Sequence, residues 1–365
     1  MNYILHIAAS LKIGGAEKVA AMIGEMQDPS KYQNHYIVFG NEIGAYEDDL
    51  IKQGCKIFHI NPPSNNYRNF LNTLKKIMQA YPYRAVHAHT MFNAGWAMHM
   101  SKKMKVPVRI SHSHSALDIN GGMKTNIYEK IMRYMILTCS TDLIACGEKA
   151  GIRLFGEKEY RKRAHLILNG IDTKQFKFNT ESRLKIRQKH NLEERYVIGH
   201  TGHLATVKNQ KYLIELMPEI LKVKPSAKLL LLGEGEDRKM LEDTIKRLEL
   251  EDHVIMTGNV MNVSDYLSAM DVFAFPSLYE GMPLSIIEVQ ANGLPCVLST
   301  GVPKDVYLTD LIHPVSLEEK GKWMELICQC ERKNPEKYAG AMKESGFDVS
   351  VAMRKIYDIY ERKHD

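Results

Sequence analysis

The segment that decides the fold is Ser277-Leu278-Tyr279-Glu280-Gly281-Met282-Pro283-Leu284-Ser285-Ile286-Ile287-Glu288. It follows an apolar run, residues 271–276, whose length and aromatic content are typical of a buried strand. Gly281 and Pro283 predict that this strand ends and a helix begins, because proline in the first helical turn gives up no hydrogen bond. Gly293 followed by Pro295 predicts where the helix stops.

The predicted helix is apolar on nearly all sides, which is typical of a buried helix. A carboxylate carried inward on it, that of Glu288, is costly unless a partner hydrogen-bonds it. Glu280 stands just before the helix, where free backbone N–H groups and the positive dipole end attract anions. A nucleotide diphosphate over the helix start, with its ribose hydroxyls on Glu288, would satisfy both features. The alternative is a buried Lys or Arg paired with Glu288.

Paired carboxylates also occur in glycosidases, which is a second interpretation of the same two residues. The helical path from Glu280 to Glu288 spans roughly 12 Å at 1.5 Å per residue. Glycosidase pairs stand about 5–9.5 Å apart. The spacing therefore excludes a glycosidase.

The spacing Glu280-x7-Glu288, set between a strand ending in Pro-Ser and a Gly-Leu-Pro turn, resembles the E-x7-E signature of the family 4 retaining glycosyltransferases. The surrounding stretch PSLYEGMPLSIIEVQANGLPCVLS is similar to that family almost residue for residue. Members of this kind build bacterial capsular polysaccharides and exopolysaccharides. The resemblance implies the α/β fold called GT-B: two facing Rossmann-like, doubly wound domains with a C-terminal helix that crosses back. It covers nearly the whole chain and is patchy in residues 40–105 and 302–345.

Length and patterning agree with two domains. A chain of 365 residues exceeds one ordinary core. Apolar runs alternate with helical stretches, and the pattern restarts near residue 196, which predicts a doubly wound parallel sheet in each half. We predict an acceptor-side domain at residues 1–180, completed by the C-terminal helix 350–365, and a nucleotide-sugar-binding domain at residues 181–349.

Three further features are typical of a cytoplasmic protein. The sequence contains no run of 18 apolar residues, so it predicts no membrane-spanning helix. The first residues lack the basic region of a signal peptide. Six cysteines are scattered through apolar or helical stretches, which suits reduced thiols.

Gly14 and Gly15 follow the first predicted strand, and paired glycines at that point let the backbone approach a phosphate closely. A plain tight turn is the alternative. The nicotinamide fingerprint G-x-G-x-x-G is absent. In the family resemblance, this loop faces the diphosphate of the donor.

His87-Ala88-His89 and Ser111-His112-Ser113-His114 both fall at predicted strand ends, where such sheets carry ligands. A metal site would want a carboxylate or cysteine cluster beside them, and none is close in sequence, so we predict no metal. An imidazole hydrogen-bonded to a sugar hydroxyl or phosphate fits better. The resemblance implies one histidine here in contact with the donor sugar and leaves His112 and His114 equally eligible.

After Gly202, members of the family usually show Gly-Arg with a Lys five residues beyond that Arg. In this chain Lys208 is in place, and His203 occupies the Arg position. The resemblance implies that Gly202, His203 and Lys208 contact and stabilise the departing diphosphate. Because histidine is only fractionally charged at neutral pH, we expect turnover that falls at high pH.

Charge is unevenly distributed along the chain. Residues 1–180 hold 24 Lys+Arg and 14 Asp+Glu, whereas residues 181–365 hold 25 and 29, so an anionic partner is expected on the first half. A helix at 126–137, a Gly-rich acceptor-side loop at 118–124 and the cluster Arg161-Lys162-Arg163 indicate peripheral contact with the anionic inner face of the plasma membrane. Nucleic acid is not favoured, because no binding motif accompanies the charge. The alternatives are a helix that packs its apolar side on the sheet and a solvated basic face with a soluble acceptor.

The resemblance implies transfer of a hexose-type sugar from a nucleotide-diphosphate donor, UDP-linked, to a glycan or a lipid-diphosphate-linked saccharide, with retention of configuration. Glu288 would hold the ribose, and Glu280 the donor sugar or its diphosphate. The backbone of the segment that follows Glu280 would bind the diphosphate through Gly281, Met282, Pro283 and Leu284. No Asp-x-Asp motif is present, so neither a metal nor a cofactor is expected. A nucleotide-sugar epimerase or phosphorylase on the same fold, or a non-catalytic nucleotide-sugar-binding subunit, is the alternative.

Overall fold

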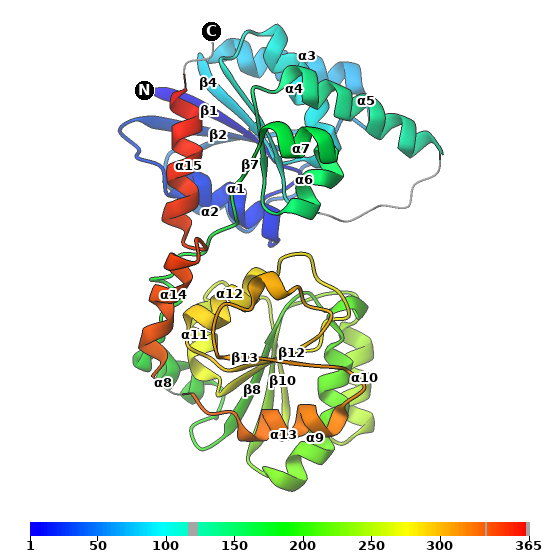
Figure 1. The fold of residues 1–365 in the computed structure, drawn as a ribbon, viewed down its shortest axis with the longest axis vertical. Helices are drawn as coiled ribbons and strands as arrows, with labels where there is room; N and C mark the ends of the chain where they lie inside the picture. The colour runs from blue at the N-terminus through cyan, green and yellow to red at the C-terminus, as the bar shows by residue number, and fades with distance from the viewer. Residues whose placement is uncertain (116–122, 333, 363–365) are drawn as a thin grey trace. The chain divides into compact units, whose positions relative to one another are not determined.

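A computed structural model describes residues 1–115, 123–332 and 334–362. Contacts between residues divide the chain into two units, Met1–Asn169 with Ser350–Asp365, and Gly170–Val349. Each unit has its own parallel β-sheet with helices on the faces (Figure 1). The two units are described separately below.

The described part of the first unit forms a seven-stranded sheet in the order β3-β2-β1-β4-β5-β6-β7, and its neighbouring strands pair in parallel. Its strands are β1 (Asn2–Ile7), β2 (Tyr32–Phe39), β3 (Lys56–Ile60), β4 (Tyr83–Ala88), β5 (Val108–Ser113), β6 (Asp142–Ala145) and β7 (Ala164–Leu166). Its helices are α1 (Gly15–Glu25), α2 (Glu47–Lys52), α3 (Tyr67–Ala80), η1 (Met91–Asn93), α4 (Ala94–Lys103), α5 (Met123–Cys139), α6 (Glu148–Phe155), α7 (Glu157–Arg163) and α15 (Val349–Glu361).

The described part of the second unit forms a six-stranded sheet in the order β10-β9-β8-β11-β12-β13, again parallel. Its strands are β8 (Tyr196–Thr201), β9 (Ala227–Leu232), β10 (Val254–Gly258), β11 (Val272–Phe275), β12 (Cys296–Ser299) and β13 (Ile312–Val315). Its helices are α8 (Thr180–Lys189), η2 (Thr206–Lys208), α9 (Gln210–Val223), α10 (Arg238–Arg247), α11 (Val263–Ala269), α12 (Leu284–Ala291), η3 (Lys304–Val306), α13 (Lys320–Gln329), η4 (Pro335–Lys337) and α14 (Tyr338–Glu344).

Helix α3 illustrates how the sequence produces these elements. The side chain of Asn66 accepts hydrogen bonds from the next two free backbone N–H groups, which caps the helix start. Phe70, Leu74 and Met78 recur every four residues, so they share one face, and that face is buried in the core of the first unit. Each such burial contributes roughly 1.5–3 kcal/mol. The cap and the apolar stripe together account for a helix at this position.

The C-terminal helix α15 returns to the first unit, as predicted. Figure 1 shows it in red beside the first-unit elements. The Tyr360 hydroxyl lies 2.7 Å from Nδ1 of His87 on β4, and Arg84 Nε donates to the Tyr360 carbonyl at 3.1 Å. Arg362 Nη1 also donates to Asp142 Oδ1 at 2.9 Å, just beyond the helix end. These bonds hold α15 and the residue that follows it against β4 and β6.

Residues 170–180 belong with the second unit. Ile171 pairs with Asp348 in an isolated parallel bridge, and the Thr173 hydroxyl donates to the Asp348 carboxylate. The two crossings of the chain between units therefore lie side by side on the second unit.

In both sheets the strand order reverses next to the first strand, between β1 and β4 and between β8 and β11. In open parallel sheets, ligands bind outside the carboxyl ends of the strands at such a reversal. The topology therefore directs attention to the loops that follow β1, β4, β8 and β11.

Candidate functional site

In the second unit, the loops after β8 and β11 lie together because their strands are neighbours in the sheet. The backbone N–H of Leu278 donates to the carbonyl of Val207 at 2.8 Å, which joins the two loops directly. Gly202, at the end of β8, has φ +159, and a Cβ on it would stand 3.7 Å from Cδ of Lys208. The glycine therefore lies against the lysine stem.

Lys208 and Glu280 meet between these loops. Lys208 Nζ lies 2.6 Å from Glu280 Oε1, and the side chains are only 22% and 10% exposed. The ammonium also stands 5.3 Å from the ring centre of Phe275, in a cation–π position. The ion pair carries no net charge, but it holds the Lys208 ammonium beside the loop that precedes α12, where partial burial reduces solvent screening.

Helix α12 is buried, as its sequence predicts. Ile286, Ile287 and Val289 have no exposed surface, and Glu288 is 6% exposed. Proline was expected inside the first helical turn, and that expectation was wrong by one position. Pro283 is the extended N-cap residue and supplies no side-chain cap, so backbone N–H groups of the first turn stay available.

Two glycines frame α12. Gly281, before the helix, has open space where a Cβ would stand. Gly293, after it, has φ +64, and a Cβ there would be 2.4 Å from the Cα of Pro335. The second position therefore requires glycine. Met282 and Leu284, which lie between these two glycines in the sequence, are half-buried.

His203 is exposed on the loop after β8. Its Nε2 lies 2.7 Å from Glu236 Oε2, and that carboxylate is exposed as well. The amide of Gln210 donates to the His203 carbonyl at 2.8 Å, which fixes the backbone. A diphosphate that used this imidazole would have to compete with Glu236 for it.

In the first unit, α1 begins at Gly15, and Gly14 is its extended N-cap. A Cβ on Gly15 would meet nothing within 4 Å, whereas one on Gly14 would meet only the end of the Glu17 side chain. Neither glycine is required by a left-handed backbone. What they provide is a helix N-terminus next to the reversal of the first sheet, with the Glu17 carboxylate beside Gly14.

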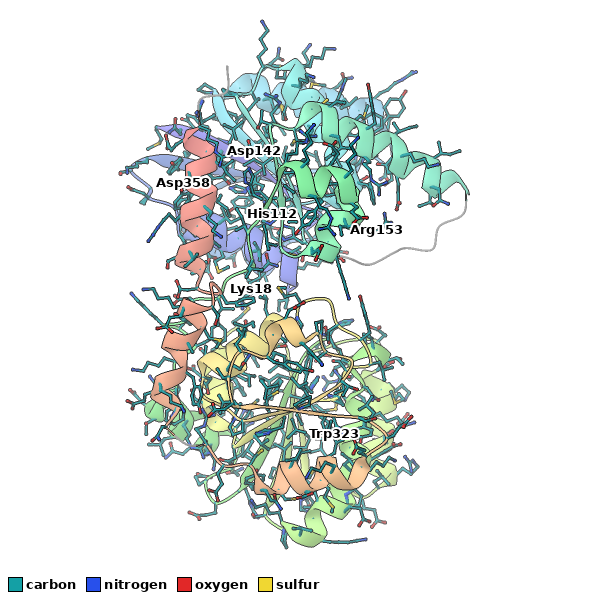
Figure 2. All side chains as sticks on the ribbon, viewed as in Figure 1. Lys18, His112, Asp142, Arg153, Trp323 and Asp358 are labelled. Carbon is teal, nitrogen blue, oxygen red and sulfur yellow. The ribbon has the colours of Figure 1, made fainter. Side chains whose placement is uncertain are left out.

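His112 and His114 lie at the carboxyl end of β5, beside the histidines of β4; Figure 2 labels His112 among the first-unit strands. Nδ1 of His112 stands 3.1 Å from Nε2 of His87, and Nε2 of His114 stands 2.8 Å from Nδ1 of His89. Burial lowers the pKa of His112 well below its usual range and that of His114 to about 4. Both rings are therefore neutral at pH 7, and His114 is the less buried of the two.

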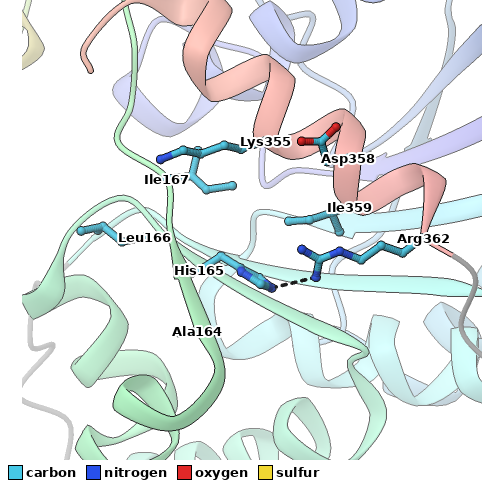
Figure 3. A pocket seen from close by; sticks show the side chains of 8 residues that line it. All are labelled: Ala164, His165, Leu166, Ile167, Lys355, Asp358, Ile359 and Arg362. Carbon is cyan, nitrogen blue, oxygen red and sulfur yellow. Dashed lines mark hydrogen bonds between the residues drawn. The ribbon is translucent and has the colours of Figure 1, made fainter. Parts of the chain in front are cut away.

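A pocket of about 360 Å³ lies elsewhere in the first unit, between β7 and α15 (Figure 3). Figure 3 shows Arg362 pointing toward His165, and their nitrogens are 3.2 Å apart. The lining of this pocket includes none of the candidate catalytic or donor-binding residues. It is lined by Ala164, His165, Leu166, Ile167, Lys355, Asp358, Ile359 and Arg362.

The apolar side of α5 does not pack on the sheet. Ile127, Ile131 and Tyr134 recur along one face of the helix, and each is at least half exposed. The core is reached by the opposite face, through Met132 and Ile136. The helix therefore packs on the core of the first unit, as the alternative expected, but not through Ile127, Ile131 and Tyr134. The predicted loop at 118–124 lies largely outside the described residues.

The basic cluster on α7 is partly neutralised. Arg161 forms ion pairs with Glu157 at 3.2 Å and Glu148 at 3.4 Å, and Arg163 pairs with Glu159 at 3.0 Å. The local acids reduce the attraction that this cluster can offer to a distant anion.

No helix in the described part of the chain has both the length and the apolar character needed to cross a bilayer. All six cysteines are free thiols, and five of them are buried. These findings agree with the composition.

Sequence reasoning missed two parts of these sites. It did not identify Phe275 under Lys208, or His6 on β1 as a neighbour of His89. Phe275 and Lys208 lie on or just after neighbouring strands, and so do His6 and His89. In each pair the two residues are far apart in the sequence. Phe275 could have been noticed as the aromatic residue that ends the strand at 272–275. His6 could have been noticed as a polar residue in an otherwise apolar first strand.

Comparison with known proteins places these features in a family. A family model described as "Glycosyltransferase Family 4" matches residues 13–175, and one described as "Glycosyl transferases group 1" matches residues 182–312. The putative glycosyltransferase EpsF of Bacillus subtilis is 30% identical, over 98% of this chain and 96% of the relative.

More distant relatives have more explicit names. CapH of Staphylococcus aureus, a capsular polysaccharide biosynthesis glycosyltransferase, is 23% identical over 100% of this chain and 99% of its own. An Escherichia coli UDP-Gal:alpha-D-GlcNAc-diphosphoundecaprenol alpha-1,3-galactosyltransferase is 26% identical over 63% of this chain and 61% of its own.

Among solved structures, Anabaena HepE in complex with UDP-glucose superposes with a TM-score of 0.80. The match covers 98% of each chain at 20% identity. This likeness shows a shared GT-B fold.

Proposed function

Because the chain belongs to glycosyltransferase family 4, we propose that it transfers a sugar, with retention of configuration, from a UDP-linked donor to a glycan or lipid-linked saccharide of the cell surface. The observation that carries the proposal is the Lys208–Glu280 pair before α12, with Glu288 buried on the same helix. An anchored cation, an open helix N-terminus and a buried carboxylate match the diphosphate and ribose of such a donor.

The ribose end of the donor uses Glu288. Its carboxylate is almost entirely buried, and ribose hydroxyls are the hydrogen-bond donors that would complement it. A helix with so few polar groups gives a nucleoside little else to bind. Glu288 therefore serves to orient the donor rather than to react.

The diphosphate end uses Lys208 and the helix start. When the bond from the anomeric carbon to the diphosphate oxygen breaks, that oxygen gains negative charge. Lys208, His203 and the backbone N–H groups of Gly281, Met282 and Leu284 stabilise this charge, with Pro283 shaping the turn. Positioned donors of this kind can contribute several kcal/mol to the transition state.

Glu280 has a positioning role in this account. Held by Lys208 before the donor binds, its carboxylate keeps the ammonium in place and remains available to sugar hydroxyls. The acceptor hydroxyl attacks on the face that the diphosphate leaves, and the departing phosphate oxygen takes its proton. No protein nucleophile, metal or cofactor enters this step.

From the first unit, the donor would use the backbone at Gly14 and Gly15 and one histidine of the pair His112 and His114. His114 suits a sugar hydroxyl better, because its ring is only partly buried whereas His112 is closed off. As a neutral imidazole it can accept a hydrogen bond without adding charge.

We place the acceptor side of the reaction at the anionic inner surface of the plasma membrane. The exposed stripe Ile127, Ile131 and Tyr134, beside the exposed Lys130, gives α5 an apolar surface with a basic element. Such a surface can enter a headgroup region, where each basic residue adds about 1 kcal/mol. A relative whose printed substrate is a diphosphoundecaprenol-linked sugar supports a lipid-linked acceptor.

Turnover of radiolabelled UDP-sugars with and without acceptor tests the proposal. Label should move into an acceptor fraction from a bacterial lipid-linked saccharide extract, and addition of EDTA should leave the rate unchanged. Conversion of the donor to another UDP-sugar would instead identify an epimerase. Tight donor binding with no turnover on any acceptor would identify a non-catalytic binding subunit.

A further inference from the structure

Five histidines gather at the carboxyl ends of β1, β4 and β5 in the first unit. The motifs His-Ala-His and His-Ser-His place alternate residues on one face of neighbouring strands, because side chains in a strand alternate with period two. His112 and His114 are 4.0 Å apart between ring centres, and each lies within 5.5 Å of His89. His6 and His87 flank this group.

Hydrogen bonds determine which nitrogen of His89 carries the lone pair. The Asn34 amide nitrogen donates to the Gly24 carbonyl, so Oδ1 faces Nε2 of His6, 3.2 Å away. Nε2 of His6 faces this oxygen and donates to it, so the singly protonated ring keeps a lone pair on Nδ1. Nε2 of His89 stands 3.4 Å from Nδ1 of His6 and donates a hydrogen bond to it. A neutral His89 therefore presents a lone pair on Nδ1.

His112 has a comparable outer partner. Its Nδ1 bonds to His87, whose own Nδ1 bonds to the hydroxyl of Tyr360. Nε2 of His112 and Nδ1 of His114 are buried and have no hydrogen-bond partner among the described residues. Hydrogen bonding between neutral rings explains the contact between His89 and His114, but it leaves these two nitrogens unpaired.

We propose that His89, His112 and His114 form a binding site for a divalent transition-metal ion of the zinc class. One ring nitrogen from each lies within 4.8 Å of the other two. Tetrahedral coordination at about 2.0–2.1 Å needs ligand nitrogens about 3.4 Å apart, so small ring rotations suffice.

The outer partners suit such an ion. Ligating histidines usually donate their second ring N–H to a fixed acceptor, and the Asn34–His6 and Tyr360–His87 pairs fill this role for His89 and His112. The cluster contains imidazoles only, which favours zinc, cobalt or copper over magnesium or calcium. The sequence argued against a metal because no carboxylate or cysteine cluster was near. The pairing of β4 with β5 brings a third histidine to the site instead.

Binding of the metal ion does not depend on the proposed transfer reaction. In that proposal, however, the donor sugar contacts one of the same histidines. An ion bound there would take the ring nitrogens that a donor sugar would use. Zinc should therefore inhibit transfer, and a chelator should reverse the inhibition.

Cobalt titration of the full chain tests the site. After treatment with EDTA and dialysis, the parent protein should bind one Co²⁺ per chain with visible absorption bands typical of low coordination number, and Zn²⁺ should displace it. His89→Phe and His112→Phe should each weaken Co²⁺ binding at least about tenfold. His99→Gln, which removes an exposed imidazole of the same unit, should leave it unchanged.

Asn34→Ala keeps all three ligands and should still weaken binding by about 10–100-fold, because it removes an outer partner. Circular dichroism confirms that each variant is folded. The parent titration requires no substitution, so absence of a visible band in the parent overturns the proposal. Bands that persist at parental affinity in a folded His89→Phe or His112→Phe variant overturn it as well.

Discussion

Replacing Glu288 with glutamine changes one atom in a buried position and isolates its charge. The side chain is 6% exposed, so solvent does little to screen its interactions. Glutamine retains the size and one acceptor oxygen but loses the charge and replaces the other oxygen by a donor. A hydrogen bond to a charged group contributes roughly 1.5–3 kcal/mol. Glu288→Gln should therefore weaken UDP binding by about 10–150-fold.

Calorimetry with UDP measures this loss, and UDP-glucose extends it to a sugar-bearing donor. The matched control is Glu251→Gln, which changes an exposed carboxylate of the same unit and should leave the affinity unchanged. Thermal unfolding shows whether α12 remains packed. Parental UDP affinity in a folded Glu288→Gln variant would refute the assignment of Glu288 to the ribose.

Three further predictions concern different parts of the chain. His203→Arg should keep or raise transfer, since arginine can make paired hydrogen bonds to phosphate; loss of transfer in a folded variant would contradict the phosphate role. Serine at positions 127, 131 and 134 should abolish salt-sensitive co-sedimentation with anionic vesicles, and alanine at Arg161, Lys162 and Arg163 should reduce it less, because both arginines are paired locally; a parent that stays in the supernatant at low salt would end the membrane proposal. Burial lowers the pKa of His200 to about 4, below its unfolded value of about 6.5. The contribution of His200 to the free energy of unfolding is therefore full above pH 6.5 and falls by roughly 3 kcal/mol as the pH drops to 4. In denaturant titrations, the stability of His200→Asn should depend less steeply on acid pH, and a dependence identical to that of the parent would contradict the neutral buried ring.

Much of the fold could be predicted from the residues that end helices and strands. The strand at 272–275 lies within the predicted run 271–276, and the helix at 284–291 ends just before Gly293, because Gly and Pro stand near their ends. The strands β6, β7 and β13 were not predicted. They are three or four residues long, too short for a periodic signal, and β13 contains Pro314 at the sheet edge.

The candidate site divides in the same way. Buried Glu288 could be predicted, because its helix is apolar in every direction. The Lys208–Glu280 pair follows from the sequence only when β8 and β11 are known to be neighbours, and 72 positions separate the two residues. The histidine cluster likewise depends on β4 lying beside β5. Pairing between distant strands is set by the whole sheet, and no local pattern encodes it.

The exposed stripe on α5 shows a different limit. Periodicity identified an apolar side at Ile127, Ile131 and Tyr134, and it could not decide whether that side faces the core or solvent. Met132 and Ile136 on the opposite face are equally apolar and fill the core instead. When a helix has apolar residues on two faces, the packing of its neighbours decides which one is buried.

The most direct test of the central claim combines the rate of transfer with the configuration of the product. Transfer from an α-linked UDP-sugar should be followed by NMR for the parent and for Lys208→Met, which retains the length of the stem without the charge. The parent should give an α-linked product, and Lys208→Met should lower kcat by about 10²–10³ with the same stereochemistry. A β-linked product, or a Lys208→Met variant that transfers at the parental rate, would contradict the account.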